Sequence, residues 1–407
     1  MQTDPKPVLL IGGGMITRLQ VLPSLYQLQR LGKIGEITIC ARRKSTVLPL
    51  LDDKDLAAAF PGHSFTPLPG ADASDDAQPD LYKQALADLP EQSIVYIAIP
   101  DQHHRQVIVD TLNAGHHVIC VKPLVLKHDE ALEIEKLARD KGLFVGVEYH
   151  KRYDDKNWIA RKKYRAGQMG EFKLGHARLH EKWWYRDSNF MNWCTTDQTD
   201  FFVYIGCHYV DLVAFITGLK PVAVSVHGIE DAFPNGNIGY LYTDARVIWE
   251  NGAVLNVQNG IAYPNQASAG NDQGMQLYTK DDATGVGGFI EHKDNIRGAE
   301  YCNLESGTDP GDTAHHFVNP DYFQMIERSD GGDGLRPVGY GFRAIEQLVE
   351  AASRVAGSGD LATRQSVLTE IDAAGFHATP ANSGYNEQVV EAGRESILNG
   401  GVRVDLK

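Results

Sequence analysis

Polar residues that can do acid–base chemistry follow three apolar, strand-like runs in the first part of the chain. They are His104 after the run 94–99, Lys122 after the run 117–121 and His150 after the run 143–147. In an open parallel sheet the ligand crevice lies outside the carboxyl ends of the strands. Lys122 is therefore expected to meet a ligand, and Pro123 restricts the backbone that presents it. The alternative for Lys122 is a solvated surface lysine, which is the usual fate of this residue type.

A glycine-rich turn follows the first apolar run, 8–11. Gly12 is expected to make the tight turn, and Gly14 to let the backbone approach a pyrophosphate at a helix N-terminus. Leucines at every third position from 19 to 31 predict that helix. Thr17 stands where the G-x-G-x-x-G fingerprint has its third glycine, so an ordinary glycine turn remains the alternative.

The second strand-like run, 37–40, leads into a basic segment that contains no acidic residue. Sites that prefer NAD usually place Asp or Glu here to bind the ribose 2′-hydroxyl. Arg42, Arg43 and Ser45 can instead hold the 2′-phosphate of NADP, because guanidinium groups bind phosphate in a bidentate way. We therefore expect NADP or NAD as cofactor, with NADP favoured. A solvated basic turn is the alternative.

The composition and charge of the 407-residue chain argue against several classes of protein. A hydrophobic content of 43% and a charged content of 23% are typical of a globular enzyme. No apolar run is long enough to predict a membrane span, and the first one is too short for a signal-peptide core. The net charge of −14 disfavours nucleic acid and anionic membranes as partners. Five widely spaced cysteines without a C-x-x-C pair favour a reducing, cytoplasmic location.

Strand and helix patterns alternate over residues 1–150. Strands are expected near 8–11, 37–40, 64–67, 94–99, 117–121 and 143–147. Helices are expected near 16–31, 46–59, 80–88, 102–114 and 128–141. This alternation predicts an α/β domain with a mostly parallel sheet and helices on both faces.

The rhythm changes after about residue 155. A helix near 157–167 precedes β-like runs at 172–181, 221–229, 238–250 and 252–262, and helices return at 340–356, 361–374 and 386–398. Asn251-Gly252 predicts a two-residue hairpin turn, and 264–275 and 284–312 are expected to be long loops. Residues 151–407 should form an α+β domain with a large, mostly antiparallel open sheet, with helices 340–398 packing back on the first domain. One sheet face needs covering, so we expect a homo-oligomer, a dimer or a tetramer.

Four motifs in combination are more specific than any one of them. They are the G-x-G turn, Ala98-Ile-Pro100 with His104, the segment 114–123 that ends in Lys122-Pro123, and Gly206-Cys-His208-Tyr-Val-Asp211. The combination resembles the glucose–fructose oxidoreductase, inositol dehydrogenase and rhizopine catabolism family. The resemblance implies a Rossmann domain for NAD or NADP and a second domain whose open sheet covers the substrate. It also implies hydride transfer between the nicotinamide and a secondary hydroxyl or ketone of a sugar, sugar derivative or cyclitol.

The resemblance also assigns roles to individual positions. Lys122 matches the lysine of the family's Glu-Lys-Pro motif, and His208 matches the histidine of Asp-x-Gly-x-His. Two positions depart from the pattern: Val121 replaces the glutamate before the lysine, and Tyr204 replaces the aspartate. The residues then expected to bind the nucleotide are Gly12, Gly14, Met15, Ile16, Arg42, Arg43, Ser45, Ala98, Pro100, His104 and Lys122.

The chemistry of alcohol oxidation gives His208 a natural role. A base must take the hydroxyl proton while hydride leaves the carbon, and histidine titrates near neutral pH. Tyr204 lies four residues before His208 and would share its helix face, and Asp211 can orient the second ring nitrogen. Lys122 can stabilise charge that develops on the substrate oxygen. From spacing alone, a buried structural histidine fits His208 equally well.

Further polar and aromatic residues are candidates for the substrate site. They are His150, Lys151, Arg152, Trp183 and Trp184. Aromatic faces pack on sugar rings, but core packing is an equal alternative for the tryptophans, as is a charged turn for 150–152. No metal is expected, because the adjacent histidine pairs at 103–104, 116–117 and 315–316 cannot easily converge on one ion.

Two other functions remain compatible with these residues. Val121 and Tyr204 fit a catalytically inactive, cofactor-sensing regulator of the same fold, whereas retention of Lys122, His104 and His208 argues against it. A reductase of a non-sugar substrate, such as a dihydrodiol, imine or enone, shares the fold as well.

Overall fold

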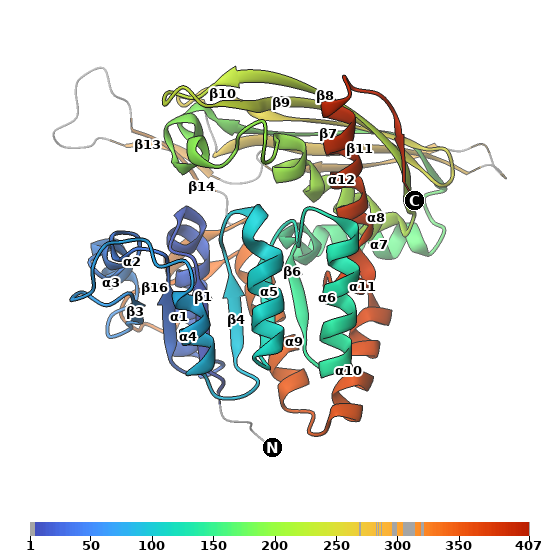
Figure 1. The fold of residues 1–407 in the computed structure, drawn as a ribbon. Helices are drawn as coiled ribbons and strands as arrows, with labels where there is room; N and C mark the ends of the chain where they lie inside the picture. The colour runs from blue at the N-terminus through green and yellow to red at the C-terminus, as the bar shows by residue number, and fades with distance from the viewer. Residues whose placement is uncertain are drawn as a thin grey trace. The chain divides into compact units, whose positions relative to one another are not determined.

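A six-stranded, fully parallel sheet forms the centre of one of the two compact units in the computed structural model (Figure 1). The structure describes residues 5–267, 270–281, 283, 285, 287–294, 299–303, 314–318 and 321–406, with backbone alone for 299–303 and 314–318. The first unit comprises residues 1–153 and 325–384, and the second comprises 154–324 and 385–407. The predicted boundary near residue 150 stays a prediction, and the segment 325–384 belongs with the first unit.

The sheet of the first unit has the strand order β3-β2-β1-β4-β5-β6. Its strands are β1 (Val8–Ile11), β2 (Ile37–Cys40), β3 (Thr66–Leu68), β4 (Ile94–Ile97), β5 (His117–Val121) and β6 (Val145–Glu148). β1, β4 and most of β5 and β2 are buried along their length, because helices cover both faces. The predicted parallel sheet is therefore confirmed, and the strand order reverses between β1 and β4, where such folds bind their ligands.

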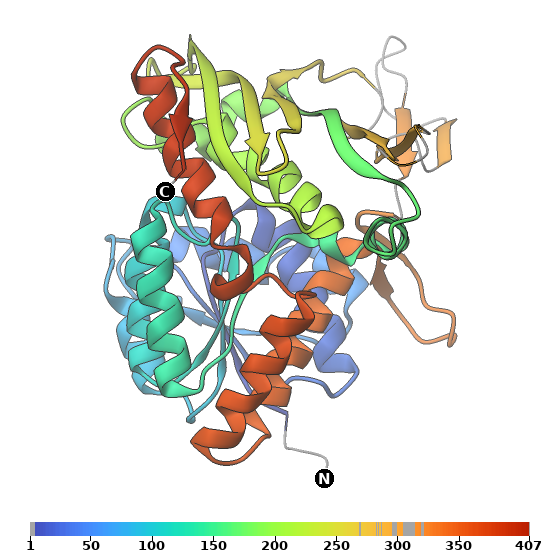
Figure 2. The same cartoon turned by 90° about the vertical axis from the view of Figure 1, so that its right-hand side faces the viewer.

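Helices cover both faces of the parallel sheet, which can be followed in Figure 2, where the view is turned by 90° from that of Figure 1. α5 (His104–Asn113) and α6 (His128–Lys141) pack together on one face, and α1 (Leu22–Arg30) and α9 (Tyr340–Ala356) pack together on the other. The remaining helices of the unit are α2 (Lys44–Leu51), α3 (Lys54–Ala59), α4 (Leu81–Ala87), α10 (Leu361–Ala374) and α11 (Pro380–Ser383). The single helix expected at 46–59 is thus two helices, separated by the N-cap residue Asp53, whose carboxylate accepts from two backbone N–H groups.

The leucine spacing in the first helix drifts around the helix axis. Leu22, Leu25 and Leu28 are fully buried, whereas Leu19 and Leu31 are about half exposed. A spacing of three residues falls behind the 3.6-residue turn, so only the central members stay on the buried face. The helix also begins with a π-helical segment, η1 (Thr17–Val21), that precedes α1.

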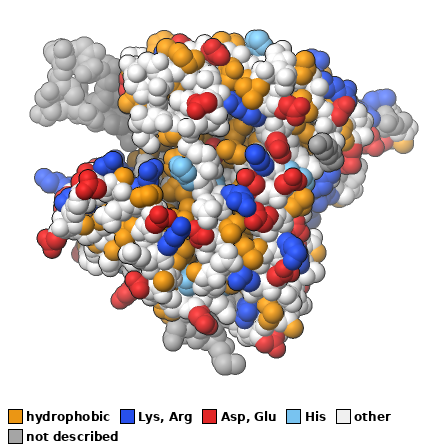
Figure 3. Space-filling model, viewed as in Figure 1, with side chains coloured by type: hydrophobic (Ala, Val, Ile, Leu, Met, Phe, Trp, Pro, Cys, Tyr) orange, Lys and Arg blue, Asp and Glu red, His pale blue; other side chains and the backbone are white. Residues whose placement is uncertain are grey.

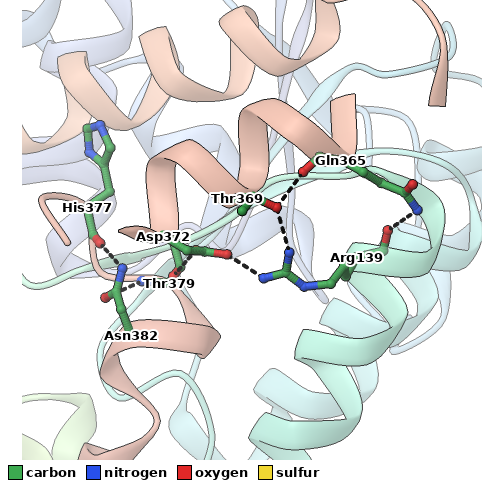
Figure 4. Close-up of polar contacts among 7 residues, drawn as sticks. All are labelled: Arg139, Gln365, Thr369, Asp372, His377, Thr379 and Asn382. Atoms are coloured by element: carbon green, nitrogen blue, oxygen red, sulfur yellow. Dashed lines mark hydrogen bonds and ion pairs between the residues drawn. The ribbon is translucent and has the colours of Figure 1, made fainter. Parts of the chain in front are cut away.

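The segment that returns to the first unit is tied to α6 by a polar network (Figure 4). Arg139 on α6 forms a 2.6 Å ion pair with Asp372 on α10, and the other oxygen of Asp372 accepts a 2.6 Å hydrogen bond from Thr379. Asn382 on α11 donates to the carbonyl of His377 at 2.9 Å. An isolated antiparallel bridge pairs Val147 with Ala378, so this segment also covers the outer edge of β6.

A seven-stranded sheet forms the second unit, in the order β12-β11-β7-β10-β9-β8-β17. Its strands are β7 (Glu171–Lys182), β8 (Pro221–Ala232), β9 (Ile238–Trp249), β10 (Val254–Tyr263), β11 (Asn271–Lys280), β12 (Gly287–Lys293) and β17 (Val404–Asp405). All neighbours are antiparallel except β7 and β10, which are parallel. The predicted large, mostly antiparallel sheet is confirmed.

The turn between β9 and β10 differs from the prediction. The backbone N–H of Trp249 donates to the carbonyl of Ala253 at 2.9 Å, so three residues, 250–252, form the turn. Gly252 adopts a positive φ of 80°, which glycine allows without strain. The two-residue turn expected at Asn251-Gly252 was wrong, because Ala253 pairs with Trp249 and Glu250, whose N–H donates to the carbonyl of Lys220, joins the turn.

Among the described residues, three α-helices belong to the second unit. α7 (Asp155–Arg165) packs against α8 (Cys207–Thr217), and α12 (Tyr385–Leu398) packs against β8. A π-helical segment, η6 (Phe202–Gly206), precedes α8. Two short hairpins, β13 (Ala299–Asn303) with β14 (Ala314–Val318) and β15 (Gln324–Glu327) with β16 (Leu335–Val338), complete the described strands.

Two properties concern the expected partners: the distribution of charge on the surface and the length and apolar character of the helices. Acidic and basic side chains are interspersed over the face seen in Figure 3, with neither sign gathered into one patch. None of the helices that the structure describes combines the length and the apolar character needed to cross a membrane.

Candidate active site

The glycine turn after β1 is fixed by its surroundings. Gly12 has a φ of 116°, and its N–H donates to the carbonyl of Cys40 at 2.8 Å. A Cβ at this position would lie 2.1 Å from the carbonyl oxygen of Ala98, so only glycine fits. Gly14 is exposed, and a Cβ there would meet no atom within 4 Å. The turn therefore has a tight inner side and an open outer side, as a backbone that receives a pyrophosphate requires.

Thr17 explains why the third glycine of the fingerprint is dispensable here. Its side chain is buried, and its hydroxyl donates a 2.9 Å hydrogen bond to the carbonyl of Gly12. The hydroxyl thus holds the turn from the helix side. Met15 and Ile16, which we expected at the nucleotide, are half-buried between these two anchors.

An acidic residue does lie at the end of β2, but a distant loop supplies it. The carboxylate of Asp75 accepts a 2.8 Å hydrogen bond from the backbone N–H of Ser45, in the first turn of α2. Arg43 donates to the Asp75 carbonyl at 2.7 Å, and Arg42 is exposed. The Ser45 hydrogen bonds, followed by the nearby charges of Arg43 and Lys44, lower the pKa of Asp75. Asp75 is therefore an anion at the place where the sequence predicted a phosphate.

The ends of β4 and β5 are held together by His104. Its Nδ1 lies 2.9 Å from the carbonyl oxygen of Pro123 and 3.1 Å from that of Leu124, and its Nε2 lies 2.9 Å from that of Ile99. The ring is fully buried and contacts only backbone carbonyls through its nitrogens. His104 thus fixes the segment that carries Lys122, and its predicted contact with the cofactor stays a prediction.

Lys122 is half-buried at the end of β5, and the Lys122–Pro123 peptide bond is cis. The positive charge of Lys122 acts to lower the pKa of two buried carboxyl groups, those of Asp101 and Glu148. Burial raises the pKa of Asp101, against the lowering effect of His104 and Lys122. Its Oδ2 has no hydrogen-bond partner among the described residues, so Asp101 carries an unused buried acceptor.

Glu148 is the functional candidate that our reasoning from the sequence missed. It ends β6, is 4% exposed, and accepts hydrogen bonds from Tyr96 at 2.5 Å and Gln20 at 2.6 Å. Burial raises its pKa to about 7, although both hydrogen bonds and the charge of Lys122 act in the opposite direction. Its place directly after a buried strand run was the available signal, but its partners lie on elements far apart in the sequence.

The polar segment after β6 is buried within the first unit. Lys151 and Arg152 are each 2% exposed. His150 stacks on Tyr340 with ring centroids 5.6 Å apart, and Arg152 donates to Asn382 at 3.2 Å. These contacts attach the segment to α9 and α11, so substrate binding by 150–152 stays a prediction.

In the second unit, His208 lies near the start of α8 and is 5% exposed. Tyr204 precedes it in the π-helical segment η6, where the wider turn shifts the i,i+4 alignment of an α-helix. The Tyr204 ring packs edge-on against Phe190 at 4.7 Å, Phe201 at 5.8 Å and Trp193 at 5.9 Å between centroids. π-Helical turns are frequent at functional sites, and here one leads directly into the helix of His208.

Asp211 is buried on α8 and bonded to α12. Its Oδ1 accepts hydrogen bonds of 3.0 Å from the Tyr385 hydroxyl and from the Asn386 side chain. These bonds hold Asp211 from the side of α12, and the proposed role of Asp211 in orienting His208 stays a prediction. Tyr385 and Asn386 were not recognised from the sequence, because α12 lies about 175 residues away along the chain.

The predicted aromatic residues of the substrate site lie at the end of β7. Trp183 is 52% exposed and Trp184 is 40% exposed. The Trp184 ring lies tilted against that of Tyr185 with the centroids 4.2 Å apart, and the backbone N–H of Trp184 donates a 2.8 Å hydrogen bond to the side-chain oxygen of Asn265. Their exposure leaves aromatic faces available to a ligand, which core packing would not.

Metal binding and disulfides receive no support from the described residues. No group of three His, Cys, Asp or Glu side chains in the described part of the chain is arranged to hold a metal ion. His116 contacts the carbonyl of Leu86, and His117 accepts from the N–H of Phe144. The pair His315–His316 lies outside the residues whose side chains are described. Cys40, Cys120, Cys194 and Cys207 are buried, and no disulfide joins any two of these four.

Comparison with known proteins identifies the first unit. Residues 6–149 match the model of an oxidoreductase family with an NAD-binding Rossmann fold. Inositol 2-dehydrogenase of Corynebacterium glutamicum is 29% identical over 134 residues, 32% of this chain and 37% of that protein. D-glucoside 3-dehydrogenase of Escherichia coli is 23% identical over 236 residues, 56% of this chain and 59% of that protein. An uncharacterized oxidoreductase of Schizosaccharomyces pombe is 32% identical over 88 residues, 22% and 24% of the two chains. The chain thus spans about a quarter to three fifths of the length of these curated relatives.

Solved structures extend the likeness to both units. An inositol dehydrogenase homologue of Azotobacter vinelandii, solved with NADH and myo-inositol, matches with a TM-score of 0.64 and 17% identity over 99% of this chain and 98% of that one. Myo-inositol 2-dehydrogenase of Lactobacillus plantarum matches with a TM-score of 0.61 and 17% identity over 99% of this chain and all of that one. At such identities the likeness establishes the fold alone. Residues 6–149 of this chain therefore match an oxidoreductase family with an NAD-binding Rossmann fold, and both units share the fold of these solved structures.

Proposed function

We propose that this protein is a nicotinamide-dependent oxidoreductase that acts on a secondary hydroxyl or ketone of a sugar, sugar derivative or cyclitol. The observation that carries the proposal is the Gly12 turn at the switch point of a Rossmann sheet, together with Lys122 at the end of β5. Two relatives, an inositol 2-dehydrogenase and a D-glucoside 3-dehydrogenase, support the same class of substrate.

The residues of the first unit fit a nicotinamide dinucleotide. The tight turn at Gly12, the open side of Gly14 and the N-terminus of the following helix form a cradle that a Cβ at position 12 would destroy. When bound, the nucleotide supplies a carbon that accepts or returns hydride. Lys122 is then the proposed donor that stabilises negative charge on the substrate oxygen.

In the second unit we assign proton transfer to His208. A histidine can take the hydroxyl proton of the substrate and return it in the reverse reaction. Asp211, held by Tyr385 and Asn386, gives α8 a fixed carboxylate three residues beyond His208. Tyr204 supports the site through its ring packing, and Trp183 and Trp184 offer aromatic faces to a sugar ring.

We propose NAD as the preferred nucleotide, a revision of the preference for NADP that Arg42 and Arg43 suggested. The Asp75 carboxylate already accepts a hydrogen bond from the N–H of Ser45, which is one of the groups that would bind a 2′-phosphate. A phosphate there would meet a negative charge at short range, whereas a ribose hydroxyl can donate to a carboxylate.

The experiment that tests the proposed function is nicotinamide absorbance with the purified protein, across a panel of sugars and cyclitols, with NAD and NADP in parallel. Turnover of a polyol or its ketone supports the oxidoreductase. Binding of the nucleotide without turnover of the panel, together with a stoichiometric partner protein in a pull-down, supports the regulator instead. Turnover of an imine or enone alone supports the reductase of a non-sugar substrate.

A further inference from the structure

Asp200 caps the helical segment that leads to Tyr204 and His208. It is fully buried, and its Oδ1 accepts a 2.9 Å hydrogen bond from the backbone N–H of Val203. Its carbonyl oxygen accepts a 3.0 Å hydrogen bond from the backbone N–H of Tyr204. An aspartate in this position satisfies N–H groups that have no partner within the helix. The place where η6 begins is therefore set by Asp200.

Arg394 on α12 binds Asp200 and the loop before it. Its Nη1 lies 3.6 Å from Oδ2 of Asp200 and donates to the carbonyl of Thr199 at 3.1 Å. Its Nη2 donates to the carbonyl of Thr196. The guanidinium carbon lies 5.6 Å from the ring centroid of Tyr240, and Tyr240 on β9 forms an isolated bridge with Asp200. One guanidinium group thus fixes the loop at three points.

The carboxylate of Asp200 needs the charge of Arg394. Its Oδ2 makes no hydrogen bond among the described residues, so the ion pair with Arg394 is its contact on that side. Burial raises the pKa of Asp200, whereas the hydrogen bond from Val203 and the charge of Arg394 favour the ionised form. A buried charge without a partner is strongly unfavourable. Loss of the guanidinium would therefore leave the cap residue uncompensated.

The helix α12 contacts the segment at two further places. A Cβ at Gly393 would lie 2.6 Å from the ring of Phe202, so α12 approaches η6 closely at the residue next to Arg394. Nearer its start, the side chain of Asn386 donates to Asp211 on α8 at 3.0 Å. The polar contacts of α12 therefore lie on both sides of His208 along the chain.

We propose that Arg394 is a positioning residue for Tyr204 and His208. It fixes Asp200, Asp200 fixes the first turn of η6, and η6 continues without a break into α8. Arg394 acts through these backbone hydrogen bonds and need not touch the substrate. The catalytic consequence rests on the proposed function, whereas the effect of Arg394 on the backbone does not.

The effect on the backbone can be measured without turnover, by hydrogen–deuterium exchange followed by mass spectrometry. Arg394→Gln should speed exchange of the amides of 202–208 by about 5–10-fold, which corresponds to the loss of a helix cap. The strand β11 lies in the same unit and should keep its native rate. Arg403→Gln, at an exposed arginine whose ion pair is with Asp405, is the matched control and should change neither segment.

Two results of this measurement overturn the proposal. One is native exchange at 202–208 in Arg394→Gln. The other is equal acceleration of 202–208 and β11, because Arg394 would then stabilise the whole unit and not the cap. Arg394→Lys keeps the positive charge without the fork of donors, so its exchange should be intermediate. If Arg394→Gln does not fold, Arg394→Lys is compared with the native protein by the same two criteria.

The catalytic consequence is a change in kcat without a change in binding. Arg394→Gln should lower kcat by about 10–100-fold and leave the KM for substrate and the affinity for NAD nearly unchanged, because a misplaced base slows the chemical step. Arg394→Lys should recover part of the loss, and Arg403→Gln should be native. Faster exchange at 202–208 with a native kcat contradicts the positioning role. If the native protein turns over no substrate at all, the proposed function fails, and the exchange measurement still decides whether Arg394 fixes η6.

Discussion

Tyr96 donates a 2.5 Å hydrogen bond to Glu148, although β5 lies between the strands that carry these two residues. The registers explain how they meet. Tyr96 pairs with Ile119, which pairs with Gly146, so Glu148 lies two residues further along the same face. Gly146 has no side chain to block the approach, and a Cβ there would lie 2.7 Å from side-chain atoms of Leu348 and Phe144. Gly146 thus leaves room on this face for the Leu348 side chain of α9.

The burial of Glu148 makes the stability of the fold depend on pH. Its pKa is about 7 in the folded state against 4.5 for an ordinary glutamate, so the folded protein binds the proton more tightly. The contribution is therefore fully favourable below about pH 4.5 and is lost as the pH rises through 7. The full difference corresponds to roughly 3 kcal/mol. Because the groups around Glu148 are Tyr96, Gln20 and Lys122, only Lys122 adds a charge to this balance.

Urea unfolding of the native protein and of Glu148→Gln across this pH range checks the prediction. The free energy of unfolding of the native protein should fall relative to that of Glu148→Gln between pH 4.5 and 7. Other groups titrate equally in both proteins and cancel in the difference. A difference that stays constant with pH would show that Glu148 titrates normally.

The alternation of apolar runs and helix patterns predicted the parallel sheet well, because burial on both faces demands continuous apolar strands such as β1 and β4. The antiparallel sheet of the second unit was predicted on other grounds, from the β-like runs after residue 172 and the hairpin signal at Asn251-Gly252. The parallel pairing of β7 and β10 was not predictable, because it joins strands about 80 residues apart without a crossover pattern between them. The helix expected at 16–31 is present, but its π-helical first turn was not predictable, since propensity gives no signal for a wider turn.

The residues of the candidate site were predictable only where they directly follow a strand in the sequence. Gly12 and Lys122 follow strands directly and could be read from the sequence. Asp75 lies 30 residues from Ser45, and Glu148 lies 128 residues from Gln20, so each contact exists only once the chain has folded. An acid missing from a local motif is therefore weak evidence that the site lacks an acid.

Asp75 should control the choice between the two nucleotides. In Asp75→Ala the N–H of Ser45 becomes available to a 2′-phosphate and a negative charge near Arg43 is removed, whereas Arg43 can keep its hydrogen bond to the backbone carbonyl of residue 75. We expect the ratio of NADP to NAD affinity to rise by about tenfold or more, since a charge-assisted hydrogen bond to phosphate contributes more than a kilocalorie. Isothermal titration with both nucleotides measures the ratio.

The neighbouring Asp76 provides the control for this change. It is an exposed carboxylate in the same loop, and its carboxylate accepts from Ser74 and makes no contact with Ser45. Asp76→Ala should leave the ratio unchanged. Equal shifts in both variants would indicate a general effect of loop charge, and a native protein that already prefers NADP would reject the assignment of NAD.

Lys122 and His208 should each be needed for turnover and dispensable for nucleotide binding. Lys122→Ala or His208→Ala is expected to lower kcat by about 10²–10⁴-fold, the usual size of general acid–base catalysis. Stopped-flow measurement of hydride transfer with the best substrate of the panel gives the rate, and fluorescence quenching gives nucleotide affinity. Lys127→Ala and His227→Ala, at exposed positions in the same two units, are the controls. Near-native rates in both Lys122→Ala and His208→Ala would remove them from the proposed mechanism.

The exposed row Leu174, Tyr278 and Phe289 should mediate self-association. Leu174 pairs with Tyr278, and Tyr278 pairs with Phe289, so three apolar side chains lie side by side across β7, β11 and β12. Their exposed fractions are 52%, 46% and 62%. An exposed apolar row on an open sheet is a common interaction surface, and we propose that a second copy of the chain covers it.

Phe289→Lys should shift the mass measured by sedimentation toward that of a single chain, because it places a charge in the contact. Ile159→Lys on α7, at a similarly exposed position in the same unit, should not. A native protein that sediments as a single chain, or a Phe289→Lys variant that keeps the native mass, would assign the row to some other contact.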